Sequence, residues 1–143
     1  MAITFTNVIY DQVIESFNTL LADEFSFPVY YDEHSGNQSF LITPVSDELE
    51  ELLTTAQVRN YTVNISYQVD IAGNYTKLSI KQVSQIAERV KRLIYNNRNY
   101  TVSGSKKFNN ATVEAIEYIR DEDNQDLVSA NMNITVSVME VIG

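Results

Sequence analysis

The sequence has no cysteine, no tryptophan, four glycines, two prolines and a single histidine among its 143 residues. The absence of cysteine excludes disulfides and thiolate-bound metals, and one histidine is too few for an ordinary zinc site. None of the patterns GxGxxG, GxxxxGK[ST] and GxSxG occurs. Because phosphate-binding loops need glycine for close backbone approach, we predict no nucleotide site and no cofactor.

Long hydrophobic runs are also missing. No apolar stretch approaches the ~20 residues that a membrane-spanning helix needs. The opening residues MAITFTNVIYDQVIES contain neither a basic start nor the unbroken apolar segment of a signal peptide. We therefore expect no membrane partner and a protein made in a cytosol.

The composition that remains is that of an ordinary globular protein, with 44% apolar and 20% charged residues. A chain of this length forms one domain and buries roughly 68–70% of its unfolded surface. We predict a single domain over residues 1–143.

Charge is distributed unevenly along the chain. The net charge is −9, but eight of the ten basic residues lie between Lys77 and Lys107, where Glu88 is the only acid. That segment therefore has a net charge of +7, and the remaining two basic and 18 acidic residues give −16. Either a solvated helix face is balanced by acidic loops, or two oppositely charged surfaces meet between identical subunits. The negative total argues against nucleic-acid binding as the main function.

Two segments have the apolar spacing of amphipathic helices. The first extends from Thr6 to Glu24, and the second from about Lys77 to Asn97. Each has one apolar stripe, formed in the first by Ile9, Val13, Phe17, Leu20 and Leu21 and in the second by Val83, Ile86, Ala87, Val90, Leu93 and Ile94.

Three segments alternate as half-buried strands do. Apolar and polar residues alternate strictly over Tyr61–Val69 and again over Val128–Val138. In Thr112–Arg120 the alternation shifts, which predicts a β-bulge near Ala115–Ile116. We expect the last two strands to form a long antiparallel hairpin with the acidic segment Asp121–Asp126 at its tip.

The remaining segments are less regular. Residues 29–31 and 40–43 flank the polar stretch DEHSGNQS, which predicts a hairpin whose second strand ends at Pro44. Residues 46–55 (SDELEELLTT) are expected to be a short helix or a loop. Residues 100–102 are expected to be a short strand, followed by the basic loop GSKKFNN.

These elements predict an α+β fold, in which an antiparallel sheet has two main helices packed on one face and ends in a long β-hairpin. The other face would carry Thr, Asn, Ser and Gln. Such a face is either solvated or an interface.

The search for chemical sites finds little. His34 lies in a polar loop and is expected to be an ordinary surface histidine. The segment Asp121–Asp126 matches a calcium loop at Asp121 and Asp123, but Gln125 and Asp126 do not fit the pattern. We expect no catalytic residues, no metal site and no enzymatic activity.

The order of elements resembles the tail terminator (tail-completion) proteins of tailed bacteriophages. The resemblance lies in the opening helix VIYDQVIESFNTLLADEF and in FLITPVSDEL leading into RNYTVNISYQVD. It continues through the helix KQVSQIAERVKRLI and the closing pair ATVEAIEYIRDEDNQDLVSANMNITVSVMEV. It covers most of the chain and is one of pattern and order, since no residue signature defines the family.

The resemblance implies a virion protein, assembled in the host cytoplasm, that forms a hexameric ring. Such a ring caps the head-proximal end of the tail tube, stops tube growth and meets the head–tail connector. Its partners would be other copies of itself, the tube protein and the connector, with DNA passing through without specific binding. Ring closure needs two different patches on each subunit. We expect the interface or lumen to include Lys106, Lys107, Asp121, Glu122, Asp123 and Asp126.

Two alternatives remain open. One is another neck, head–tail joining or minor tail protein, which differs only in its partner. The other is a stand-alone enzyme or small-molecule-binding domain with a pocket between helices and sheet, whose ligand would raise the melting temperature.

Overall fold

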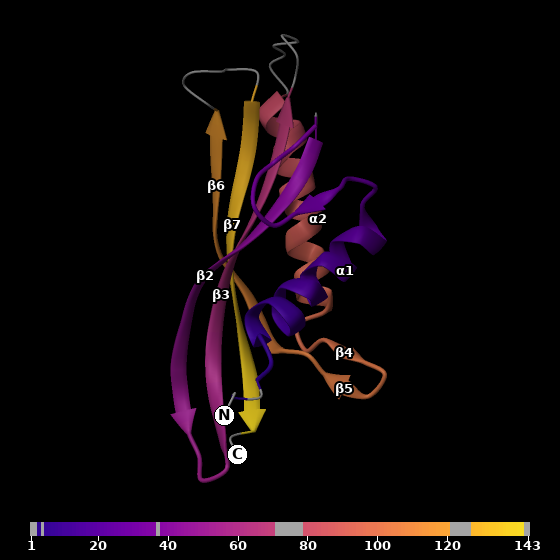
Figure 1. The fold of residues 1–143 in the computed structure, drawn as a ribbon. Helices are drawn as coiled ribbons and strands as arrows, with labels where there is room; N and C mark the ends of the chain where they lie inside the picture. The colour runs from indigo at the N-terminus through magenta and orange to yellow at the C-terminus, as the bar shows by residue number, and fades with distance from the viewer. Residues whose placement is uncertain (1–2, 4, 37, 71–78, 121–126, 142–143) are drawn as a thin grey trace.

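The computed structural model describes residues 3, 5–36, 38–70, 79–120 and 127–141. A five-stranded sheet has the order β1-β2-β3-β7-β6, and β4 and β5 form a separate two-stranded hairpin. All helices pack on one face of the large sheet (Figure 1). The strands are β1 (Val29–Tyr30), β2 (Gln38–Leu52), β3 (Ala56–Asp70), β4 (Thr101–Val102), β5 (Ser105–Lys106), β6 (Asn109–Arg120) and β7 (Leu127–Val141).

The helical layer follows the two apolar stripes. A π-helical turn η1 (Ile9–Ile14) continues directly into α1 (Glu15–Glu24), and α2 (Ser79–Asn96) is the second helix. The two helices also contact each other, since the Arg89 guanidinium lies 4.4 Å from the Phe25 ring centre and 3.0 Å from the Glu24 carboxylate. Both predicted helices are confirmed.

The core fills the space between this layer and the inner face of the sheet. Along β3 and β7, alternate side chains point inward, as the strict alternation predicted. Fully burying one such side chain contributes roughly 1.5–3 kcal/mol. The largest fully buried side chains are Phe17, Phe40, Phe108, Ile14, Leu21, Ile42, Ile65, Ile94, Met132, Ile134, Val13 and Val63.

The second strand is much longer than the sequence suggested. β2 continues through Pro44 to Leu52, so the prediction of a helix or loop at residues 46–55 is wrong over most of that segment. Pro44 is tolerated because β1 pairs only with Phe40 and Leu41, which leaves the outer edge beyond them without a partner among the described strands. Pairing with β3 overrides the helix preference of Leu and Glu, with bulges at Pro44/Ser46 and Leu49/Glu51.

The predicted hairpin between residues 29–31 and 40–43 is also wrong. β1 and β2 run parallel, with Val29 opposite Phe40, and the Phe40 amide donates a hydrogen bond to the Pro28 carbonyl at 2.9 Å. Phe27 packs against Phe40 with ring centres 5.8 Å apart, which directs the incoming chain along β2. The α+β class is confirmed, with one parallel pair in an otherwise antiparallel sheet.

The closing pair of strands agrees with the sequence. β6 and β7 are antiparallel, from Arg120 opposite Val128 to Asn109 opposite Ser137. A bulge lies between Val113 and Ala115, close to the predicted position. The expected tip, residues 121–126, lies outside the described residues.

Candidate assembly surfaces

One end of the sheet extends past the helices, where β3 begins and β7 ends (Figure 1). We call residues 45–58 and 139–141 the projecting end. No helix covers it, so its apolar side chains meet solvent. The exposed fractions are 50% for Leu49, 66% for Leu52, 39% for Leu53, 62% for Met139 and 86% for Val141. Leu49 and Leu52 lie on the helix-side face, and Met139 and Val141 lie on the outer face. Apolar side chains exposed on both faces make this end a candidate binding surface.

The same projecting end is acidic. Asp47, Glu48, Glu50 and Glu51 are all exposed, and no basic residue occurs between Val45 and Val58. Because of the bulge between Leu49 and Glu51, Glu51 lies on the same outer face as Glu48, and Leu52 lies on the same helix-side face as Leu49. The projecting end therefore presents carboxylates on one face and leucines on the other along an edge that has no partner among the described strands.

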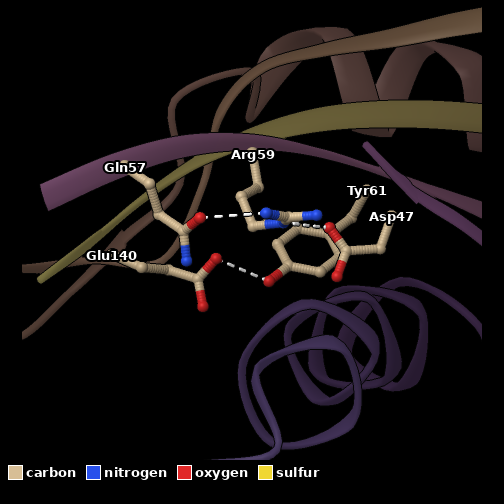
Figure 2. A network of polar contacts seen from close by, with 5 residues as sticks. All are labelled: Asp47, Gln57, Arg59, Tyr61 and Glu140. Carbon is tan, nitrogen blue, oxygen red and sulfur yellow. Dashed lines mark hydrogen bonds and ion pairs between the residues drawn. The ribbon is translucent and has the colours of Figure 1, made fainter. Parts of the chain in front are cut away.

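A network of polar contacts lies where the projecting end leaves the helical layer (Figure 2). The Arg59 Nε donates to Asp47 at 2.5 Å, and its Nη1 donates to Gln57 at 2.9 Å. The Tyr61 hydroxyl donates to a Glu140 carboxylate oxygen at 2.7 Å. These contacts connect β3 to both of its neighbours and hold the strands together where little hydrophobic packing remains.

Burial and the Glu140 carboxylate act together on Tyr61. The side chain is only 4% exposed, and burial followed by this hydrogen bond raises the pKa of Tyr61 above its usual value. Beside it is a hollow of about 330 Å³, lined by Tyr61, Asp47, Glu140 and the N-terminal segment Phe5–Ile9. Because Arg59 and Tyr61 already engage both carboxylates, this hollow has no unsatisfied catalytic pair.

The outer face of the sheet is polar and hydrogen-bonded to itself, as its composition predicted. Matching side chains pair across β3 and β7: Thr62 with Thr135 at 3.1 Å, and Asn64 with Asn133 at 3.0 Å. Thr135 also donates to Glu114 of β6 at 2.7 Å. The side chains that β3 and β7 contribute to the centre of this face are uncharged.

The predicted interface residues Lys106 and Lys107 lie at the β4–β5 hairpin, which replaces the expected basic loop. Its turn residues Ser103 and Gly104 have φ values of 52° and 79°, as a tight type I′ hairpin requires. The Lys107 amide donates to the Tyr100 carbonyl at 2.8 Å, and its own carbonyl accepts from Gln12 Nε2 at 2.6 Å. These bonds fix the hairpin against η1, with the Lys106 side chain exposed.

The hairpin follows the C-terminal end of α2, and both carry basic residues. Val102 and Lys107 line a hollow together with Asp11 and Glu15 of the helical layer. We call Tyr95, Arg98, Val102, Lys106 and Lys107 the basic hairpin surface. All except the half-buried Lys107 are exposed, and Tyr95 and Val102 are each 40% exposed. A hollow of about 540 Å³ lies here, lined by the single segment from Tyr95 to Thr101.

The other predicted interface residues, Asp121, Glu122, Asp123 and Asp126, lie outside the described residues. What the sequence interpretation missed is the acidic projecting end. The segment SDELEELL has the composition of a helix. Only the apolar residues Val45, Leu49 and Leu52, which recur next to acids in the sequence, indicated a surface that is both apolar and acidic.

His34 is not an ordinary surface histidine. It is half-buried against the outer face, with Nδ1 2.7 Å from the Ser39 hydroxyl and Nε2 3.0 Å from the Ser66 hydroxyl. Burial lowers the pKa of His34. No carboxylate orients this histidine as in a catalytic triad, because both ring nitrogens are bonded to serines.

Within the described ranges, no three His, Asp or Glu side chains converge on a point that could hold a metal ion. No helix in that part of the chain is long and apolar enough to cross a membrane.

No family model matches the chain, and no curated protein matches its sequence. Among solved structures, a chain from "Virion of native gene transfer agent (GTA) particle" aligns with 94% of this chain and 92% of its own length. The identity is 12% and the TM-score 0.48.

Proposed function

We propose that this protein is a virion structural protein that acts by assembly rather than catalysis. Within that class we propose a tail terminator, a ring subunit that caps the head-proximal end of a tail tube and joins it to the connector. The order of elements supports this role through the resemblance described above.

The observation that supports the proposal most is the exposure of apolar side chains on the projecting end. A protein that works alone would normally cover Leu49, Leu52 and Met139, whereas a subunit leaves them exposed until a partner arrives. The strand edge beside them is open, and such edges in a stable monomer are usually blocked. This combination is typical of a subunit before assembly.

The charge balance fits passage of DNA through a ring. A lumen with the same negative sign as DNA prevents the duplex from adhering to its wall. The net charge of −9 and the outer sheet face, where Thr135 donates to Glu114, are both consistent with this requirement.

The alternative of a small-molecule-binding domain is supported by one feature, the hollow of about 540 Å³. Its volume is in the range of ligand pockets. However, its lining comes from one continuous segment rich in Asn and Arg, whereas ligand pockets are formed by apolar side chains converging from several elements. We therefore favour the assembly function.

The test is the native mass of the full chain over a concentration series, with negative-stain images of the largest species. We expect a closed ring with a central hole wide enough for duplex DNA. A protein that stays monomeric at every concentration, and whose melting temperature rises with a small molecule, would contradict the proposal.

A further inference from the structure

We propose that the projecting end of one copy docks onto the basic hairpin surface of a second copy, and that this contact closes the ring. The inference deepens the proposed function and depends on it. It identifies the two patches that a ring subunit needs, and it replaces the acidic hairpin tip with the β2–β3 end as the acidic partner.

The first argument is charge complementarity within one chain. The projecting end has four exposed acids, and within the described part of the chain Asp47 alone among them has an ion-pair partner, Arg59. The opposite surface contributes Arg98, Lys106 and Lys107 within ten residues of sequence. Opposite potentials steer two copies together and fix their orientation, while two identical ends repel.

The second argument is that each patch also has exposed apolar side chains. Leu49 and Leu52 lie on the helix-side face of the β2 edge, and Glu48 and Glu51 lie on its other face. On the second surface, Tyr95 lines a hollow with Arg98, and Val102 lines another with Lys107. A partner that receives the β2 edge would cover the leucines and leave the carboxylates paired with basic groups at the rim, which is the usual anatomy of a protein interface. A nucleic acid would match the basic groups but would leave the leucines exposed.

The third argument is position. In Figure 1 both patches lie at the same end of the molecule, with β2 at one side of the sheet and the β4–β5 hairpin at the other. A contact between different patches is heterologous, so each copy keeps one free patch of each kind until the assembly closes. Because the patches are at the same level, successive copies lie beside one another rather than stacked.

The fourth argument is that both patches are held in shape before they meet. The Asp47–Arg59–Gln57 contacts hold one side, and the type I′ turn with the Lys107 backbone bonds holds the other. Such preorganisation reduces the conformational entropy lost on binding.

The experiment is a charge-swap series in the full chain. One variant carries Glu48→Lys and Glu51→Lys, and the other carries Lys106→Glu and Lys107→Glu. Each variant alone places like charges in contact, so we expect the Kd of self-association to rise at least about tenfold. A mixture of the two restores attraction at every contact of an alternating ring, so we expect assembly to recover.

Matched controls reverse exposed charges outside both patches, with Glu33→Lys in one variant and Lys81→Glu in another. These should assemble like the unmodified chain. Circular dichroism on all variants would confirm that the fold is intact. Undiminished assembly of both patch variants, or failure of their mixture to recover while the controls assemble, would overturn the inference and leave the proposed function standing.

A cysteine cross-link tests the contact directly, because the chain contains no cysteine of its own. A Glu51→Cys, Lys106→Cys double variant should form a ladder of covalent oligomers on oxidation, whereas each single variant should not. Dimers from Glu51→Cys alone would indicate an end-to-end contact and overturn the inference. No cross-link in any variant, together with a monomeric native chain, would overturn the proposed function as well.

DNA binding by the Lys106→Glu, Lys107→Glu variant separates a protein partner from a nucleic acid. Loss of salt-dependent DNA binding in this variant, with assembly unchanged, would assign the basic hairpin surface to DNA and overturn the inference.

Discussion

The helix-covered part of the sheet and the projecting end are made from the same three strands, yet they differ in what holds them. Under the helices, β3 places Val63, Ile65 and Tyr67 against a packed core. A few residues earlier on the same strand, Arg59 and Gln57 form polar contacts and the neighbouring leucines of β2 are exposed. Pairing of β3 with β7 is continuous from one part to the other, and pairing of β3 with β2 continues through two bulges.

The comparison shows that backbone hydrogen bonds between strands continue beyond the part of the sheet that packs on the hydrophobic core. Beyond the helices, backbone pairing and a few side-chain contacts such as Tyr61–Glu140 replace apolar burial. A region of this kind adds little to the stability of the monomer but presents a rigid edge with apolar side chains. We therefore assign the stability of the monomer to the helix-covered part of these strands, and assembly to their projecting end.

The largest expected effect separates the two regions directly. Phe17, which is 1% exposed and stacks on Phe108 with ring centres 5.0 Å apart, belongs to the covered part. Phe17→Ala should lower the free energy of unfolding by about 3–5 kcal/mol in a urea titration. Leu52→Ala on the projecting end should change it by less than about 0.5 kcal/mol while weakening self-association. A large loss of stability in Leu52→Ala would mean that the projecting end belongs to the core.

The covered part was also the part that the sequence predicted well. The alternation of β3 and β7 and the apolar stripe of α2 exist because one face of each is buried, and burial leaves a periodic signal. The same reasoning located the β6 bulge, since the shift in alternation at Val113 to Ile116 reflects a real change of face.

The projecting end was missed because nothing buries it and periodicity is therefore lost. Leu and Glu favour a helix locally, and only pairing with β3 makes residues 46–52 a strand. The parallel β1–β2 pair was missed for a related reason, since two strand residues carry no period and the deciding contacts of Phe27 are tertiary. Of the candidate site, the role of Lys106 and Lys107 stays a prediction from charge clustering, whereas the acidic end depended on a strand that the sequence did not indicate.

A smaller effect is expected at the boundary between the two regions, where Tyr61 donates to Glu140. Tyr61→Phe removes this bond and should lower stability by roughly 1.5 kcal/mol. Because the pKa of Tyr61 is raised in the folded state, its contribution is complete well below pH 10, the ordinary pKa of tyrosine, and is lost as the pH rises through and beyond that value. The stability difference between the unmodified chain and Tyr61→Phe should therefore shrink between pH 9 and 11. Tyr118→Phe, at an exposed tyrosine of β6, is the control, and an equal shrinkage there would contradict the assignment.

The smallest expected effect lies at the other end of the sheet, where His34 bonds to Ser39 and Ser66. Burial lowers the pKa of His34, so below pH 6.5 the unfolded chain binds the proton more readily than the folded one. Stability should therefore fall as the pH decreases from 7.5 to 5.5, and His34→Gln should reduce that slope. His34 is the only histidine and there is no cysteine, so no other side chain ordinarily titrates in this window.

Urea titrations at three pH values would measure the slope of stability against pH, and an unchanged slope in His34→Gln would show that the histidine is solvated in both states. Since the site is far from the projecting end, ring assembly of this variant at pH 7.5 should match that of the unmodified chain.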